Sequence, residues 1–194
     1  MEFVLASNNQ KKLREMDEIL RREGCSVISM KEAGFHTDPE ENGSTFEENA
    51  LIKAKAAMEA SGRACIADDS GLAVDGLGGA PGVQSAPSCV GTDLDRVYFL
   101  LENMKGMEDR TARFVSCVAC AFPDGTSIVV RGECPGVILE ELKGEGGFGY
   151  DPVFYVPAEG YTFAEMPQER KNEISHRGAA MVKFCAELKK QGKI

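Results

Sequence analysis

A short apolar run that ends in two adjacent aspartates constrains the fold of this chain more than any other feature. Residues 65–67 are apolar and lead directly into Asp68, Asp69 and Ser70. Such a run is typical of a buried strand in an α/β protein, and these strands finish at the sheet edge where ligands bind. Carboxylates there are held rigidly and stay reachable from solvent. We therefore expect a divalent-metal site where this strand ends, with a plain polar turn as the alternative.

Strand and helix patterns alternate along the first half of the chain, and a β-hairpin pattern follows later. The expected strands cover residues 2–6, 26–30, 65–68, 113–122 and 127–133, with a turn and strand over 150–156. The expected helices cover residues 10–23, 45–61, 92–105 and 175–190. This order predicts an α/β fold with a mixed sheet flanked by helices, in a single domain over residues 1–194.

Charge and composition exclude several classes of protein. The net charge of −9 argues against a nucleic-acid coat or an anionic membrane surface as partner. No apolar stretch is long enough to cross a membrane, so we expect a soluble, cytoplasmic protein. Seven scattered cysteines suit a reducing compartment. Cys117 and Cys120 lie three apart in one expected strand, which points them to opposite faces and predicts core residues rather than a metal pair.

Two polar segments could bind an anion and a metal. The first connects the first strand to the first helix and reads Ser7, Asn8, Asn9, Gln10, Lys11 and Lys12. A loop entering a helix can aim backbone N–H groups at a phosphate, and a lysine adds a full charge; the alternative is an ordinary N-cap. In the second, Glu40 and Glu41 precede the second helix, which carries Lys53. Together with the two aspartates, these acids would form the oxygen-rich shell that Mg²⁺ prefers.

Two segments of the second half could bind a ligand. The glycine-rich residues 144–149 match a dinucleotide fingerprint by letter, but no helix pattern follows. We interpret them as a flexible loop that lets backbone approach a ligand and offers Phe148 for stacking, with a turn and a buried Phe148 as the alternative. His176 lies among hydrogen-bond donors at a helix start. No Gly-x-Ser-x-Gly elbow accompanies it, so donation of hydrogen bonds is its expected task.

Six motifs in order resemble the inosine triphosphate pyrophosphatase family, the non-canonical purine nucleoside triphosphate pyrophosphatases, over essentially the whole chain. They read SNNQKK (7–12), TFEENA (45–50), ADDSGL (67–72), GGAPG (78–82), GFGYDP (147–152) and ISHRG (174–178). The resemblance implies an elongated mixed α/β fold of two lobes with a central cleft, a homodimer, and a requirement for Mg²⁺. It also implies hydrolysis of ITP, dITP and XTP to the monophosphate and pyrophosphate.

The resemblance assigns roles residue by residue. The triphosphate contacts it implies are Ser7, Asn8, Asn9, Gln10, Lys11, Lys12 and Lys53. It implies Glu41 and Asp69 as metal ligands, Asp69 also as proton acceptor, and Ser70 as a substrate contact. The base pocket it implies consists of Phe148, Gly149, Tyr150, Asp151, Lys171, His176 and Arg177. Donors in that pocket would donate hydrogen bonds to the 6-oxo group of hypoxanthine or xanthine and reject the amino group of adenine. Neither the motifs nor their spacing indicates how guanine, which also has a 6-oxo group, is excluded.

Some questions stay open at this point. Asp68, Glu41 or a metal-activated water could accept the proton instead of Asp69. The chain departs from the family at Gln84 and Pro87, where an aromatic and a cationic residue are usual, which puts substrate or dimer contacts from those positions in doubt. Other classes are a pyrophosphatase for modified pyrimidine triphosphates, a phosphoacceptor receiver and a non-catalytic nucleotide sensor. The Ser-His-Arg motif speaks against the first, and the position of the acid pair speaks against the receiver.

Overall fold

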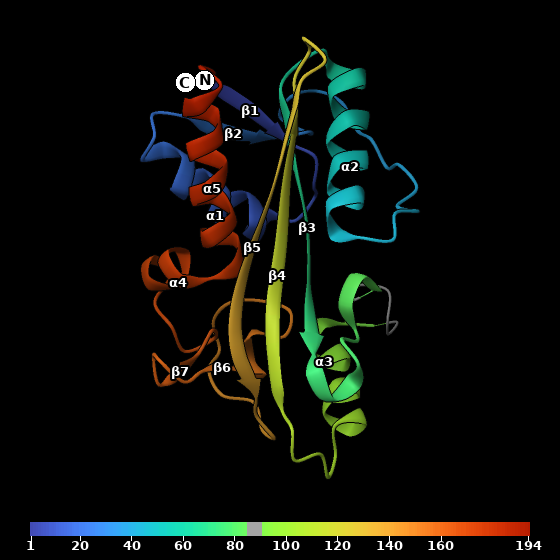
Figure 1. Ribbon diagram of the computed structural model, residues 1–194, viewed down its shortest axis with the longest axis vertical. Helices are drawn as coiled ribbons and strands as arrows, with labels where there is room; N and C mark the ends of the chain where they lie inside the picture. The colour runs from blue at the N-terminus through green and yellow to red at the C-terminus, as the bar shows by residue number, and fades with distance from the viewer. Residues whose placement is uncertain (85–90) are drawn as a thin grey trace. The chain divides into compact units, whose positions relative to one another are not determined.

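The computed structural model describes residues 1–84 and 91–194, and in this part of the chain seven strands form one mixed sheet (Figure 1). The strands are β1 (Glu2–Leu5), β2 (Ser26–Ser29), β3 (Cys65–Val74), β4 (Thr111–Ala121), β5 (Ser127–Ile138), β6 (Phe154–Val156) and β7 (Tyr161–Thr162). Their order in the sheet is β2-β1-β3-β4-β5-β6-β7. β1 pairs in parallel with β2 and β3, whereas β6 pairs antiparallel with β5 and β7. The predicted mixed α/β class is therefore confirmed, and the cleft that the resemblance implies stays a prediction.

Five α-helices accompany these strands within the described residues. They are α1 (Gln10–Arg21), α2 (Phe46–Ser61), α3 (Asp93–Asn103), α4 (Gln168–Ile174) and α5 (His176–Lys190). Short 3₁₀ turns cover Asp75–Leu77, Gly82–Gln84 and Asp151–Val153. Residues 85–87 follow Gln84 and lie outside the described residues, so the departure from the family at Pro87 has no structural description.

The chain divides into two compact units, each with its own hydrophobic core. Unit 1 consists of Met1–Asp69, Ser116–Gly132 and His176–Ile194. In unit 1, α1 packs against α5, and Phe3 of β1 meets Phe184 of α5 edge-on with ring centroids 5.9 Å apart. Helix α2 lies on the other side of β3 from α1 and α5 (Figure 1). The two sides of β3 in this unit therefore face different helices.

Unit 2 consists of Ser70–Val115 and Glu133–Ser175. Its core combines the buried face of α3 with a group of aromatic rings. Phe114 of β4 stacks on Phe163 with centroids 5.6 Å apart, and Phe154 of β6 packs against both rings. Such aromatic contacts stabilise a core beyond the apolar area that they bury.

Local sequence signals explain where the helices begin and end. Asn9, Thr45 and Thr92 cap α1, α2 and α3 by accepting backbone N–H groups of the first turn. Thr92 forms a capping box with Asp95, and Gly62 ends α2 in the left-handed conformation with φ 66°. The predictions of these three helices are confirmed.

Two expected strand ends were wrong, and two short elements were missed. β3 does not end at the aspartates but continues through them to Val74, and β5 extends to Ile138. Polar residues continue these strands because neighbouring strands supply the ladder partners and charged partners satisfy the side chains. The helix α4 and the two-residue β7 were missed, since both are shorter than the pattern that periodicity can detect.

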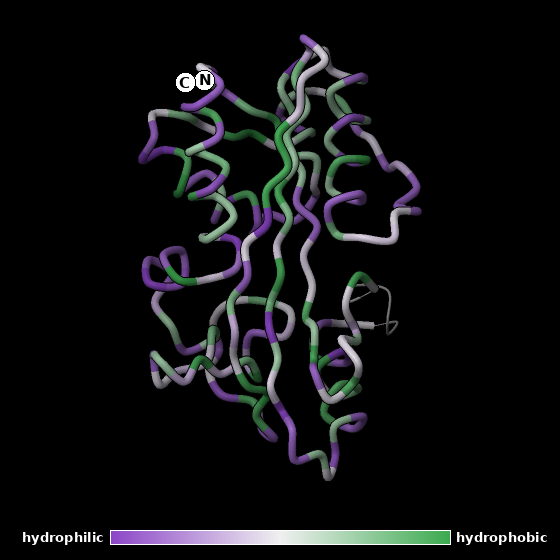
Figure 2. Tube along the Cα trace, viewed as in Figure 1, coloured by the Kyte–Doolittle hydropathy of each residue, from purple (hydrophilic) through white to green (hydrophobic). Residues whose placement is uncertain are grey.

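The hydropathy of the chain follows this architecture. Figure 2 shows hydrophobic residues gathered along the strands, whereas α4 and the loop before α2 are hydrophilic. Cys117 and Cys120 of β4 are both fully buried and free, which confirms the prediction of core residues. No helix in the described part of the chain is long and apolar enough to cross a membrane.

Candidate functional site

Asp68 lies at the centre of a buried charge cluster in unit 1. Its carboxylate is fully buried and lies 2.7 Å from the ammonium of Lys12 and 3.4 Å from the guanidinium of Arg177. Ser116 of β4 donates a hydrogen bond of 3.2 Å to the same carboxylate, and Arg177 also pairs with the buried Glu15 of α1 at 2.5 Å. Two cations and two anions are thereby balanced, as buried charges must be.

Asp69 belongs to a second, more accessible group. Lys53 of α2 lies 3.4 Å from the Asp69 carboxylate and 3.1 Å from that of Glu41, and it donates a 2.8 Å hydrogen bond to the Asp68 backbone carbonyl. The Asp69 side chain is 14% exposed and that of Glu41 is 45% exposed. Two carboxylates share one ammonium, so this group has room for a further positive charge.

The alternation of a β-strand explains why neighbouring aspartates have opposite surroundings. Successive side chains point to opposite faces of a sheet, so Asp68 meets α1 and α5 while Asp69 meets α2. Burial alone would raise the pKa of Asp68, but Lys12 and Arg177 outweigh it and hold this pKa well below its ordinary value. Burial, with nearby Asp68 and Glu41, raises the pKa of Asp69 although Lys53 opposes it. The strand therefore separates an acid whose pKa is lowered from one whose pKa is raised.

The loop before α1 forms the N-cap of this helix. The Asn9 side-chain oxygen accepts the N–H groups of Lys11 and Lys12 at 3.0 and 3.1 Å, and Ser7 Oγ accepts the Asn9 N–H at 3.1 Å. These amides therefore hold the cap rather than point at a bound anion. Asn8, Gln10 and Lys11 are exposed, and Ser7, Asn9 and Lys12 are half-buried. Binding of a triphosphate by these six residues stays a prediction.

In unit 2 the predicted base-binding turn surrounds a buried ion pair. Lys171 of α4 is 2% exposed and lies 2.8 Å from the buried carboxylate of Asp151. Asp151 also accepts the Phe148 N–H at 3.0 Å, and the Lys171 ammonium lies 4.9 Å from the centre of the Phe148 ring. Phe148 and Gly149 are half-buried and Tyr150 is buried. The structure brings together Phe148, Gly149, Tyr150, Asp151 and Lys171, which are five of the seven predicted base contacts.

The glycines before this turn pack closely against the protein itself. A Cβ atom on Gly144 would come within 2.6 Å of the Ala164 backbone, and one on Gly147 within 2.2 Å of the Asp151 carboxylate. Gly146 donates its N–H to the Ala164 carbonyl at 3.0 Å. The close backbone approach expected with a ligand is made here with the chain's own residues, and this packing explains the glycines.

His176 and Arg177 begin α5 in unit 1, and both are buried. The Arg177 guanidinium pairs with Glu15 and Asp68 within unit 1, and its role toward a base stays a prediction. Glu15 was not predicted as a site residue. It lies one turn after Lys12 on the apolar face of α1, and an acid in such a stripe is the signal that could have identified it. Ser70 is half-buried within β3.

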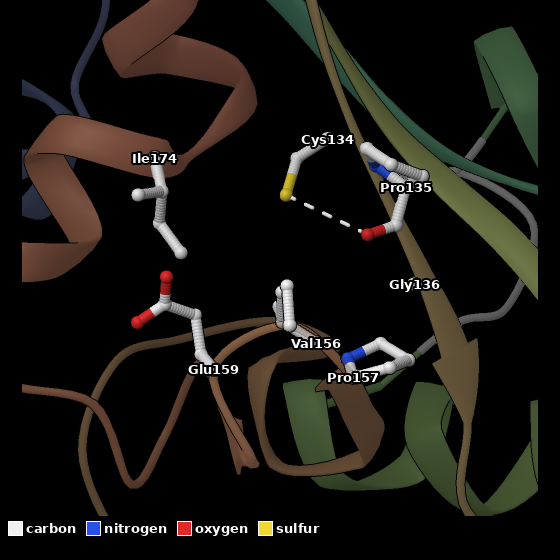
Figure 3. A pocket seen from close by; sticks show the side chains of 8 residues that line it. Cys134, Pro135, Gly136, Val156, Pro157, Glu159 and Ile174 are labelled. Carbon is white, nitrogen blue, oxygen red and sulfur yellow. Dashed lines mark hydrogen bonds between the residues drawn. The ribbon is translucent and has the colours of Figure 1, made fainter.

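A separate cavity of about 490 Å³ lies in unit 2, and none of the predicted site residues lines it (Figure 3). Its lining is mainly apolar, with the Cys134 thiol and the Glu159 carboxylate directed into the space. Burial, with Glu159 nearby, raises the pKa of Cys134 to about 11, so this thiol is neutral at pH 7. Glu159 is paired with Arg170 at 2.6 Å.

Comparisons with known proteins agree along nearly the whole chain. The model of the Ham1 family matches residues 3–187. A dITP/XTP pyrophosphatase from Desulforamulus reducens is 50% identical over 188 residues, which are 94% of this chain and 93% of that protein. A dITP/XTP pyrophosphatase from Thermus thermophilus is 48% identical over 184 residues, which are 93% of this chain and 88% of that protein.

Solved structures share the fold. The Ham1 protein of Staphylococcus aureus matches with a TM-score of 0.86 and 40% sequence identity. The match covers 98% of this chain and 100% of that chain. A HAM1 protein from Coxiella burnetii matches with a TM-score of 0.87 and 40% identity, covering 98% and 99% of the two chains. These matches confirm the resemblance drawn from the six motifs, and the chain belongs to the Ham1 family.

Proposed function

We propose that this protein hydrolyses the non-canonical purine nucleoside triphosphates ITP, dITP and XTP to the nucleoside monophosphate and pyrophosphate. The observation that carries the proposal is the Asp69 carboxylate, which stands on a rigid strand with Lys53 and Glu41 beside it. Its Oδ2 atom is buried and accepts no hydrogen bond from the described residues. The similarity to dITP/XTP pyrophosphatases at 50% and 48% identity supports the substrate class.

The donor set around Asp69 fits a divalent metal, and we propose Mg²⁺. Within the described residues no group of three or more His, Cys, Asp or Glu side chains forms a closed metal site. An Mg²⁺ ion that is bound through one or two carboxylates and completed by water and substrate phosphates needs no such group. Asp69 and Glu41 would hold the ion, with the unsatisfied Asp69 oxygen as the natural ligand atom. When bound, the ion supplies charge neutralisation on the phosphates.

Residues of unit 1 would stabilise the leaving group and accept the proton of the attacking water. Attack of water on the α-phosphorus develops negative charge on the pyrophosphate leaving group, which positioned cations stabilise. Lys53 and Lys12 would provide these cations. A carboxylate would also accept the proton of water, and a raised pKa improves a general base. Asp69 has a raised pKa whereas that of Asp68 is depressed by two cations, so we assign the proton to Asp69.

The turn of unit 2 supports recognition of a planar base. Phe148 offers an aromatic face, and the Lys171 ammonium beside it is a buried donor for a 6-oxo group. Adenine presents an amino group at this position and would leave such a donor unsatisfied, which costs about 1–3 kcal/mol. Selection of hypoxanthine and xanthine over adenine follows from this chemistry.

We also propose that the enzyme is a cytoplasmic homodimer with no nucleic-acid or membrane partner. The net charge of −9 supports the lack of a nucleic-acid or anionic membrane partner, and the dimer and the compartment are what the family resemblance implies. Light scattering coupled to gel filtration measures the mass, and a mass of 21.0 kDa, that of one chain, would contradict the dimer.

A pyrophosphate-release assay tests the function directly. With ITP, dITP, XTP, GTP and ATP in parallel, we expect rapid release from the first three and slow release from ATP. A non-catalytic nucleotide sensor would instead bind ITP in calorimetry without releasing pyrophosphate. Release of orthophosphate in place of pyrophosphate would contradict cleavage at the α-phosphorus.

Removal of the metal should abolish the reaction. We expect excess EDTA to stop pyrophosphate release from ITP and added Mg²⁺ to restore it. The carboxylates of Asp69 and Glu41 are negative, so they cannot neutralise the phosphates without a bound cation. The fold should persist under EDTA, since each core is built from apolar residues. Circular dichroism recorded in the same samples separates loss of metal from unfolding, and full activity in EDTA would refute the metal assignment.

Replacement of Lys12 should weaken the binding of every triphosphate alike. We expect Lys12→Ala to raise KM about tenfold for both ITP and ATP, which corresponds to about 1.4 kcal/mol for a charged phosphate contact. A phosphate contact cannot sense the base, so the ratio of the two KM values should stay constant. Lys55→Ala on the exposed face of α2 is the matched control. A changed preference between ITP and ATP would place Lys12 in base recognition instead.

A further inference from the structure

The Phe148 turn of unit 2 is held by two carboxylates from different elements. Asp151 belongs to the turn itself and accepts the Phe148 N–H from within. Asp93, the first residue of α3, accepts the Gly149 N–H at 2.9 Å from outside the turn. Fifty-six residues separate Asp93 from Gly149, so this hydrogen bond is a tertiary contact between α3 and the turn.

Gly149 has a backbone conformation that other residues rarely adopt. Its φ angle of +59° lies in the left-handed region that favours glycine. The adjacent Phe148 carries the ring that the proposed function uses for stacking. A carboxylate that accepts the Gly149 amide thereby fixes the backbone immediately after this ring.

The side chain of Asp93 is itself oriented. Its other carboxylate oxygen lies 3.0 Å from the Arg96 guanidinium, one turn later in α3. Asp95 has the same chemistry and lies two residues away, but its carboxylate is used within the helix cap and accepts the Thr92 N–H at 2.8 Å. The first turn of α3 therefore contains two aspartates, one that closes the helix and one that reaches the Phe148 turn.

We propose that Asp93 is a positioning residue for nucleobase binding, which acts by holding the Gly149 amide and so the ring of Phe148. The inference rests on the proposed function, because it assigns the Phe148 turn to the base. Asp93 needs no contact with substrate in this role. The resemblance counts Gly149 among the substrate contacts, and its N–H is used by the protein itself.

Three variants with two inhibitors test the proposal. The inhibitors are inosine monophosphate, which carries the base, and inorganic tripolyphosphate, which does not. We expect Asp93→Ala to raise KM for ITP about 5–10-fold with kcat changed less than about twofold, as for loss of one charge-assisted hydrogen bond. The inhibition constant of inosine monophosphate should rise in parallel, and that of tripolyphosphate should not. Asp93→Asn should restore most of the affinity, because its amide oxygen can accept the same N–H.

Asp95→Ala is the matched control within the same helix turn. It removes the capping box, so we expect a lower Tm with an unchanged KM for ITP. The proposal is overturned if Asp93→Ala leaves KM unchanged, tightens ITP binding, or weakens tripolyphosphate equally. It is also overturned if Asp95→Ala reproduces the rise in KM. Failure of the wild-type protein to release pyrophosphate from ITP would instead reject the proposed function, which is measured first.

Discussion

Asp69→Asn is expected to lower kcat for ITP at least ~100-fold while the free energy of unfolding stays close to that of the wild type. The substitution keeps the size of the side chain but removes the charge that would hold the metal and accept the proton. The fold should tolerate it, because the Asp69 side chain is partly exposed and Lys53 retains its contacts with Glu41 and the Asp68 carbonyl. Steady-state kinetics with saturating Mg²⁺ and urea unfolding measure the two quantities.

The matched control for this variant is Asp75→Asn. Asp75 follows the end of β3, is exposed and pairs with Arg113 at 3.2 Å. The same chemical change there should leave kcat unaltered, since Asp75 is not among the proposed site residues. Near-normal turnover by Asp69→Asn would remove Asp69 from the mechanism and leave Glu41 or a metal-activated water as the proton acceptor.

Asp68→Asn should destabilise the fold by about 3–5 kcal/mol, the usual cost of removing one partner from a buried ion pair. The variant leaves the ammonium of Lys12 and the guanidinium of Arg177 with Glu15 as their remaining anion in this cluster. Urea unfolding followed by circular dichroism measures the loss. Asp124→Asn, which breaks the exposed pair with Lys193, should change stability little. Equal stability of wild type and Asp68→Asn would show that the cluster contributes nothing to folding.

The difference in unfolding free energy between the wild type and Asp68→Asn should depend on pH with a definite sign. The pKa of Asp68 is depressed in the folded protein, so its stabilisation is fully present above the ordinary value of 3.8. As the pH falls below 3.8, the unfolded chain takes up the proton first and the stabilisation is progressively lost. The difference in unfolding free energy between wild type and Asp68→Asn should therefore be constant at neutral pH and shrink on acidification below about 4. A difference that grows on acidification would contradict the ion-pair assignment.

Local chemistry made much of this fold predictable. The caps at Asn9, Thr45 and Thr92 depend only on residues within one turn, so their helices could be located from the sequence. The hairpin of β4 and β5 followed from two apolar runs around a Pro-Asp-Gly turn. The helix α4 and strand β7 escaped because each is too short to show a period, and tertiary contacts stabilise them.

The candidate site was predicted as a set of residues but not as a set of contacts. The sequence motifs selected Lys12, Lys53, Asp68 and Asp69, and the structure places all four in unit 1. They did not indicate that Glu15 pairs with Arg177, 162 residues away. Nor did they indicate that Asp93 holds the Gly149 amide. Such contacts join segments that are far apart in the sequence. They depend on the tertiary fold, which periodicity and spacing do not encode.

The sequence by itself determined the class of fold, the family and a set of candidate site residues, because periodicity, caps and ordered motifs are properties of short segments. Only the tertiary structure decided the surroundings of each acid. Asp68 and Asp69 are adjacent and chemically identical, yet β3 runs through both and turns them to opposite faces. One face buries its carboxylate between two cations, and the other leaves a carboxylate oxygen unsatisfied beside Lys53. Burial and charged residues that are distant in the sequence, which no local pattern contains, set the direction in which each pKa is shifted.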